Sequence, residues 1–277
     1  MNAAVTGGGN RGPGMERITS TSNPKIRHLS ELRAKPKARR ETGTFLVEGE
    51  RLVLDTPPEF LEEIYVTSEV YERLKAQLSE RTDKENVVLL SVEAMAKASD
   101  TKSPQGIMAL VRQPVWRRED LLADPALLLV LENIQDPGNL GTMLRTAEAA
   151  GAGGVILSAG CADLFGPKAV RATMSAVFRV PFVTAQSIPA AVLSLQKKGV
   201  RVYAACLHGY SSSYETQDYR SPCAFVIGNE AKGLCEDTIR AADERVFIPM
   251  AGEIESLNAA VSAGILMYEA ARQRGFR

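Results

Sequence analysis

Polar residues occur at three places in the C-terminal half of this 277-residue chain, each time soon after a short apolar run. Asn139 and Arg145 follow the first run, Glu230 follows the second, and Ser256 and Asn258 follow the third. Polar side chains that follow buried strands in this way can point at a bound ligand. These residue types therefore predict a polar site that orients a ligand.

Each of these segments has the pattern of a buried strand, a loop rich in Gly, Pro, Asn and Glu, and then a helix. The segments span residues 127–151, 224–234 and 245–274. In open α/β sheets, ligands bind where such loops leave the carboxyl ends of the strands. The three loops therefore predict one composite pocket and favour an enzyme.

Helix caps offer a simpler interpretation of some of these residues. We expect Asn139 to be the N-cap of the first helix, and Ser256 to be the N-cap of a last helix over 256–274. Taken alone, Asn139 would be a cap and Arg145 one half of a surface ion pair. Together, beside the Pro137–Gly138 turn, they indicate polar groups directed at a ligand.

The wider pattern after Ala126 is an alternation of strands and helices, which predicts a mostly parallel sheet covered by helices. A separate α/β unit is expected from Thr44 to Val111, preceded by a short basic helix over 22–40. The expected domains are a disordered tail, a basic helix with a first α/β domain, a linker and a second α/β domain. Their bounds are 1–14, 15–113, 114–125 and 126–277.

Composition places the chain among ordinary globular proteins, with 45% hydrophobic and 24% charged residues. No apolar stretch approaches the roughly 20 residues of a membrane helix. The N-terminus lacks the apolar core of a signal peptide, so we expect a cytoplasmic protein. The four cysteines and two histidines show no zinc or disulfide spacing, so no metal is expected.

Charge is balanced overall but uneven along the chain, since residues 17–40 carry many Lys and Arg residues and Glu31 as their one acidic residue. Such a run indicates nucleic acid contact, with a solvated helix face as the alternative. The glycine-rich loop 228–233 could approach a phosphate, but it matches neither the Walker nor the dinucleotide pattern. A nucleotide-dependent enzyme of doubly wound fold is therefore disfavoured.

Taken together, the three segments resemble the signature motifs of the SpoU/TrmH family of RNA ribose 2′-O-methyltransferases, within the SPOUT superfamily. N-x-G-x-x-x-R-T-A occurs at 139–147, I-G-N-E-x-x-G-L at 227–234, and I-P-M-x-G-x-x-x-S-L-N at 248–258. Residues 41–112 resemble, more loosely, the ribosomal-protein-like substrate-binding domain of that family.

The resemblance implies a C-terminal α/β domain with a trefoil knot, a homodimer formed through that domain, and S-adenosylmethionine as methyl donor. By matching positions, the cofactor cleft would be lined by Gly228, Ile248, Met250 and Leu257. The polar catalytic set would be Asn139, Arg145, Glu230, Ser256 and Asn258. Within it, Arg145 would orient the ribose and the adjacent phosphate, and Glu230 would hold Arg145 in place.

The expected substrate is large-subunit (23S) ribosomal RNA, because a basic helix and a separate first domain resemble the ribosomal RNA enzymes of the family. RNA contacts are expected from Lys37, Arg39 and Arg40. One alternative is a transfer RNA ribose 2′-O-methyltransferase. Another is a non-catalytic RNA-binding or ribosome-assembly factor of the same fold, although such a protein would lack Arg145 or the cofactor loops, and both are present.

Overall fold

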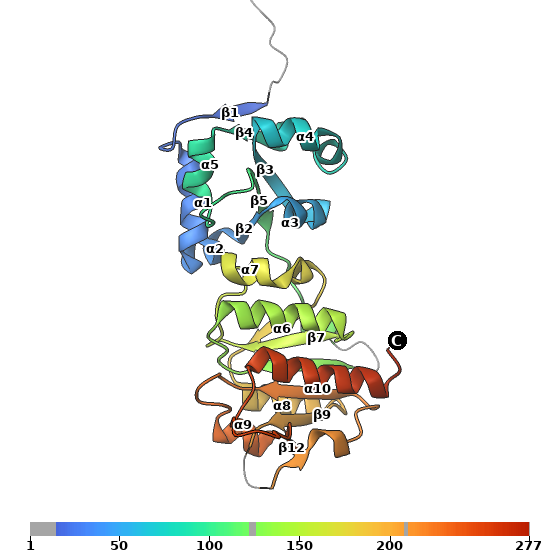
Figure 1. Ribbon diagram of the computed structural model, residues 1–277. Coiled ribbons are helices and arrows are strands. Elements are labelled where there is room, and N and C mark those ends of the chain that lie inside the picture. Colours follow the sequence, from blue (N-terminus) through green and yellow to red (C-terminus); the bar gives the residue numbers. More distant parts are fainter. Residues whose placement is uncertain (1–14, 122–125, 208–209, 277) are drawn as a thin grey trace, which may run out of the picture. The chain divides into compact units, whose positions relative to one another are not determined.

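The computed structural model describes residues 15–121, 126–207 and 210–276, so the expected tail over 1–14 and part of the expected linker lie outside it. Contacts divide the chain into one compact unit that ends at Arg112 and a second that begins at Gln113. Figure 1 traces the elements of both units. Each unit has its own sheet.

The first unit is built on a mixed five-stranded sheet of order β1-β4-β3-β5-β2. Strand β5 runs antiparallel to β2 and β3, whereas β1, β4 and β3 are mutually parallel. Its strands are β1 (Glu16–Ile18), β2 (Thr44–Glu48), β3 (Leu61–Thr67), β4 (Val87–Leu90) and β5 (Ile107–Arg112). Its helices are α1 (Pro24–Ala34), α2 (Pro36–Thr42), α3 (Glu50–Asp55), α4 (Ser68–Ser79) and α5 (Val92–Ala98).

Two helices occupy the region where we expected one over 22–40. Pro36 confines the preceding Lys35 to an extended backbone, with φ −117° and ψ 111°, and so ends α1 before α2 begins. Asn23 caps α1 by accepting a hydrogen bond from the Lys25 amide at 2.8 Å. The apolar side of α1 packs with α5 over the sheet through Ile26, Leu29 and Leu32, so basic side chains occupy its outer side.

The second unit is built on a seven-stranded sheet of order β10-β12-β9-β11-β6-β7-β8, in which every pair is parallel. The strands are β6 (Leu127–Leu131), β7 (Gly154–Ser158), β8 (Phe182–Ala185), β9 (Arg201–Ala205), β10 (Ser212–Ser213), β11 (Cys223–Ile227) and β12 (Glu244–Phe247). The prediction of a mostly parallel sheet is therefore confirmed. Strand β11 enters the sheet between β6 and β9, although both precede it in the chain.

Helices cover both faces of this sheet, which explains why β6 and β11 are buried along their whole length. The helices are α6 (Pro137–Ala149), α7 (Pro167–Thr173), α8 (Ile188–Gln196), α9 (Glu236–Ala241) and α10 (Ala259–Gln273). Side chains of α8 and α9 join one core cluster with Leu128, Val130 and Val226. Figure 1 shows α10 in front of the sheet and α8 behind it. No helix among the described residues has the length and apolarity needed to cross a membrane.

Helices α6 and α7 approach each other closely at Gly141 of the first motif. A Cβ atom at this position would lie 2.4 Å from the carbonyl oxygen of Ala169 and 2.7 Å from the Cβ of Ala172. The motif glycine is therefore explained by packing, which fixes α6 and the residues that it carries.

Candidate active site

Three loops form the candidate site at one edge of the seven-stranded sheet. They follow β6, β11 and β12, which are parallel and so end at the same edge. The loop after β6 leads to Asn139 in α6, the loop after β11 carries Glu230, and the loop after β12 ends at Asn258. The topology thus brings together residues that are more than 100 positions apart in the chain, as expected for a composite site.

A chain of hydrogen bonds connects these loops. The side-chain Nδ2 of Asn258 donates to Oδ1 of Asn139 at 3.0 Å, and Nδ2 of Asn139 donates to Oε1 of Glu230 at 3.0 Å. Because an ionised carboxylate only accepts hydrogen bonds, it fixes the orientation of the Asn139 amide, which in turn fixes that of Asn258. The three polar residues therefore hold one another in a single arrangement.

The helix caps differ from the sequence prediction, and the difference leaves the side chains of Asn139 and Ser256 out of the capping role. Asp136, not Asn139, caps α6, since its Oδ1 accepts from the Asn139 amide at 2.8 Å, and Pro137 occupies the first helical position. Asn258, not Ser256, caps α10 by accepting from the amides of the second and third helical residues. The Asp-Pro pair was a sequence signal for the first cap.

Electrostatics favour an ionised Glu230. Burial raises the pKa of this carboxyl, but hydrogen bonds from the Asn139 side chain and from the backbone amides of Gln135 and Asp136 outweigh it, so the pKa lies below its ordinary value. The two amides lie 3.3 and 3.4 Å from the carboxylate oxygens. Glu230 thus anchors the loop after β11 to the loop after β6.

Arg145 contrasts with these residues. Its side chain is exposed on α6 and forms no hydrogen bond or ion pair with the residues that the structure describes. We expected Glu230 to hold Arg145, but the bonds that Glu230 accepts come from the first loop and from Asn139. The expected pairing is therefore not formed within the described chain, and the guanidinium is available to an external anion.

A cleft of about 640 Å³ opens beside these loops, which is within the usual range for a small-molecule site. All four residues expected to bind the cofactor line it, namely Gly228, Ile248, Met250 and Leu257. Glu230, Ser256 and Asn258 line it as well, whereas Asn139 and Arg145 are not among its lining residues. The sequence analysis missed further lining residues from the end of β9 and from α10, including Cys206, Leu207, Ser262 and Leu266.

The glycine-rich loop after β11 folds tightly on itself at the wall of this cleft. Asn229 and Gly233 exchange backbone hydrogen bonds of 2.9 and 3.0 Å, and Oδ1 of Asn229 accepts from the amides of Ala231 and Lys232, both at 3.0 Å. A Cβ atom at Gly228 would lie 2.3 Å from the carbonyl carbon of Gly233. Only glycine at 228 permits this close approach of the backbone, and residues 228–233 of the turn line the cleft.

The residues expected to contact RNA divide into two kinds. Lys37 and Arg40 are exposed on α2. Arg39 is only 4% exposed, and its guanidinium donates to the carbonyl oxygens of Leu32 and Arg33 at the end of α1. Since these bonds satisfy carbonyls that the helix leaves without partners, Arg39 stabilises the turn between the helices, and its assignment to RNA is corrected.

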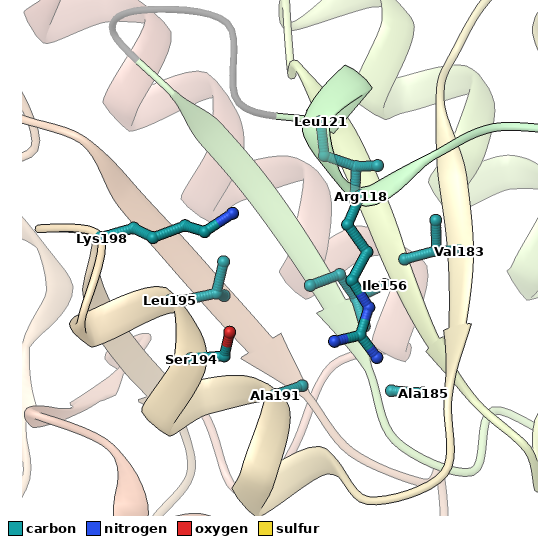
Figure 2. A pocket seen from close by; sticks show the side chains of 9 residues that line it. All are labelled: Arg118, Leu121, Ile156, Val183, Ala185, Ala191, Ser194, Leu195 and Lys198. Atoms are coloured by element: carbon teal, nitrogen blue, oxygen red, sulfur yellow. The ribbon is translucent and has the colours of Figure 1, made fainter.

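A second hollow lies elsewhere in this unit, against α8, β7 and β8. It measures about 40 Å³ and is lined mainly by aliphatic side chains, with Arg118 and Lys198 reaching over it (Figure 2). It is too small for a nucleoside-sized ligand and contains none of the motif residues. Among the described residues, no group of three or more His, Cys, Asp or Glu side chains could hold a metal ion.

Comparison with known families matches both units. Residues 126–268 match the SpoU rRNA Methylase family, and residues 23–109 match the MRM3-like substrate binding domain. The first match includes all three loops of the site, and the second covers most of the first unit.

Individual relatives are similar over nearly the whole chain. The 23S rRNA (guanosine(2553)-2′-O)-methyltransferase RlmP of Bacillus subtilis is 36% identical, with 92% of this chain and 98% of the relative covered. An AdoMet-bound rRNA methyltransferase from Sinorhizobium meliloti has a TM-score of 0.80 and 32% identity, with 93% and 98% covered. The SpoU methyltransferase AviRb from Streptomyces viridochromogenes with AdoMet has a TM-score of 0.79 and 25% identity, with 91% and 98% covered.

Proposed function

Because the chain belongs to the SpoU rRNA methylase family, we propose that it transfers a methyl group from S-adenosylmethionine to a ribose 2′-hydroxyl of large-subunit (23S) ribosomal RNA. One observation carries this proposal. Hydrogen bonds between Asn258, Asn139 and Glu230 join the three motif loops beside a cleft of ligand size. Helix α6 of the same unit exposes Arg145.

The cleft fits the cofactor in size and chemistry. Its lining combines the apolar residues Ile248, Met250 and Leu257 with the glycine-rich loop that begins at Gly228. Polar and charged residues, including Glu230, Ser256 and Asn258, also line it, and a site for a nucleoside-like molecule needs such polar groups beside apolar walls. When bound, S-adenosylmethionine would supply a methyl group on a positively charged sulfur, which would leave as the neutral thioether of S-adenosylhomocysteine while the proton of the 2′-hydroxyl passes to water.

The protein's own residues bind and orient the reacting groups. Arg145 holds the ribose and its adjacent phosphate, and its guanidinium stabilises negative charge that develops on the 2′-oxygen. A guanidinium donates hydrogen bonds and has no acceptor atom for a proton, so this role is electrostatic. Asn139, Glu230 and Asn258 maintain the geometry of the three loops, and the exposed Ser256 contributes its hydroxyl at the cleft wall.

The first unit selects the RNA. Its match to a substrate-binding domain, together with the exposed cations Lys37 and Arg40 on α2, supports this role. The similarity to ribosomal RNA methyltransferases extends through both units, which favours ribosomal RNA over transfer RNA. The expected setting is the cytoplasm.

We further propose that the C-terminal unit contains a trefoil knot and forms a homodimer through α10. The insertion of β11 between two strands that precede it, and the packing of α10 against α6, are compatible with such threading. Helix α10 exposes Val261 and Tyr268, which a second copy would cover. Sedimentation equilibrium tests the dimer, and a monomer at micromolar concentration would contradict it.

Methyl transfer from labelled S-adenosylmethionine to total RNA that lacks this modification tests the main proposal. Digestion of the product should give a single 2′-O-methyl nucleoside from ribosomal RNA. Label in transfer RNA would overturn the choice of substrate. Cofactor binding without label in free RNA or in ribosomal particles would favour the non-catalytic alternative.

A further inference from the structure

Glu132 is a buried carboxyl group next to the first loop of the site, and it is not among the residues that line the cleft. Glu132 directly follows β6 and is only 5% exposed, and its backbone amide donates to the Ile227 carbonyl at the end of β11 at 2.9 Å. A buried carboxylate costs considerable free energy unless hydrogen-bond donors surround it. The roles assigned above do not use Glu132.

The donors to Glu132 all come from one short stretch of chain. Its carboxylate accepts from the Cys235 amide at 2.9 Å, from the Cys235 Sγ at 3.2 Å and from the Thr238 Oγ1 at 2.7 Å. Cys235 is the N-cap residue of α9, and its side chain forms no cap bond to the helix. Glu132 therefore fixes the point where the glycine-rich loop ends and α9 begins.

The next residue, Asn133, holds the other end of the same loop. Its carbonyl oxygen accepts from Nδ2 of Asn229 at 2.8 Å. Asn133 has a φ of +58°, and Ser158 supports this conformation, because the Ser158 hydroxyl accepts from the Asn133 amide at 2.9 Å and donates to Oδ1 of Asn133 at 3.1 Å. Two consecutive residues thus bind both ends of segment 228–235.

We propose that Glu132 is a positioning residue which, together with Asn133, holds segment 228–235 in its cofactor-binding conformation before the cofactor arrives. The inference rests on the proposed function, because that segment forms a wall of the proposed S-adenosylmethionine cleft. A loop that is already held in its binding conformation loses less conformational entropy when the cofactor binds. If the competent conformation is only partly populated, the apparent affinity falls by that fraction.

Substitutions of Thr238 test this role with little change in volume. Thr238 is fully buried, so Thr238→Val removes the hydroxyl donor to Glu132 while nearly preserving shape, and Thr238→Ser keeps the hydroxyl. We expect Thr238→Val to raise the Kd of S-adenosylmethionine about tenfold, as for one lost hydrogen bond to a charged group. Thr238→Ser should stay within about threefold of the wild type. Glu132→Gln should resemble the valine variant, and kcat at saturating cofactor should change less than KM in both.

Amide hydrogen exchange without cofactor gives a second readout. Amides of residues 229–235 should exchange faster in Thr238→Val than in the wild type, and Thr238→Ser should restore protection. Unchanged Kd and unchanged exchange in Thr238→Val would overturn the inference, even if Glu132→Gln failed to fold. A wild-type protein that does not bind S-adenosylmethionine would instead contradict the proposed function, and exchange would still test the anchoring.

Discussion

Arg145 and Glu230, the two charged residues of the candidate site, differ in their hydrogen bonding. Glu230 accepts a side-chain hydrogen bond from Asn139 and two backbone hydrogen bonds, whereas Arg145 is exposed and has no partner among the described residues. A carboxylate that accepts three hydrogen bonds from neighbouring loops suits a role in maintaining the arrangement of those loops. A group without partners suits the binding of something external, such as a phosphate or a developing alkoxide.

Replacement of Arg145 should separate chemistry from cofactor binding. We expect Arg145→Ala to abolish methyl transfer and to leave the Kd of S-adenosylmethionine within about threefold, because Arg145 does not line the cleft. Arg145→Lys keeps the charge but loses the planar fork, so it should retain only a small part of the activity. Single-turnover transfer and calorimetric titration measure the two effects. Unchanged turnover in Arg145→Ala would remove this residue from the mechanism.

The stabilising contribution of Glu230 to the free energy of unfolding should decrease on acidification. Its pKa is lowered in the folded state, so its stabilising contribution is complete above its unfolded value of about 4.3 and is lost as pH falls through the folded value. Glu230→Gln should therefore be less stable than the wild type at pH 7, with a smaller difference at about pH 3. Urea unfolding at both pH values measures this. A difference that grows on acidification would contradict the prediction.

The junction after α7 carries unusual backbone strain. Met174 and Ser175 have φ values of +48° and +70°, in the left-handed region where side chains are disfavoured. Ser175 is 1% exposed, and its hydroxyl has no hydrogen-bond partner. The close packing of α7 on α6 offsets this cost.

Glycine should relieve part of this strain. We expect Ser175→Gly to be about 1 kcal/mol more stable than Ser175→Ala, because both variants remove the unsatisfied hydroxyl but only glycine adopts this φ without steric cost. Thermal and urea unfolding of the two variants provide the comparison. Equal stability would show that the left-handed conformation costs little here.

Regular elements with strong patterns were predictable, and those defined by contacts between distant segments were not. The apolar runs that open the segments at residues 127, 224 and 245 were predicted to be strands, and they form β6 (Leu127–Leu131), β11 (Cys223–Ile227) and β12 (Glu244–Phe247). The three-residue β1 and the two-residue β10 were missed, because pairing with β4 and β12 defines them rather than a pattern of their own.

In the candidate site, too, residue types and spacing were predictable, whereas contacts between distant segments were not. The motif residues along the loops could be named from their types and spacing, and the structure brings Asn139, Glu230 and Asn258 together. The Asp136–Pro137 pair could have indicated the cap of α6, but the spacing of residues could not reveal that Arg39 is buried or that Glu132 holds the start of α9. Each of these depends on competition among several polar groups for one set of donors or acceptors.

The two compact units suggest a separation between RNA capture and methyl transfer. The double substitution Lys37→Glu and Arg40→Glu should weaken RNA binding at least about tenfold and reduce its salt dependence, because phosphate contacts release counterions. Cofactor affinity should not change, since both residues belong to the first unit. Lys75→Glu on α4 is a control for the loss of one surface cation. Filter binding at several salt concentrations would contradict the assignment if the double variant matched this control.

The position of β11 also has a consequence for how the protein is made. As the chain leaves the ribosome, β6 can pair with β7, but its other edge has no partner until β11 is synthesised roughly 90 residues later. At about 5–20 residues per second, that edge waits for several seconds as a template for incorrect pairing. An interrupted translation product would therefore be prone to aggregation. A fragment that ends before β11 would also lack the loops after β11 and β12, so it could not form the candidate site.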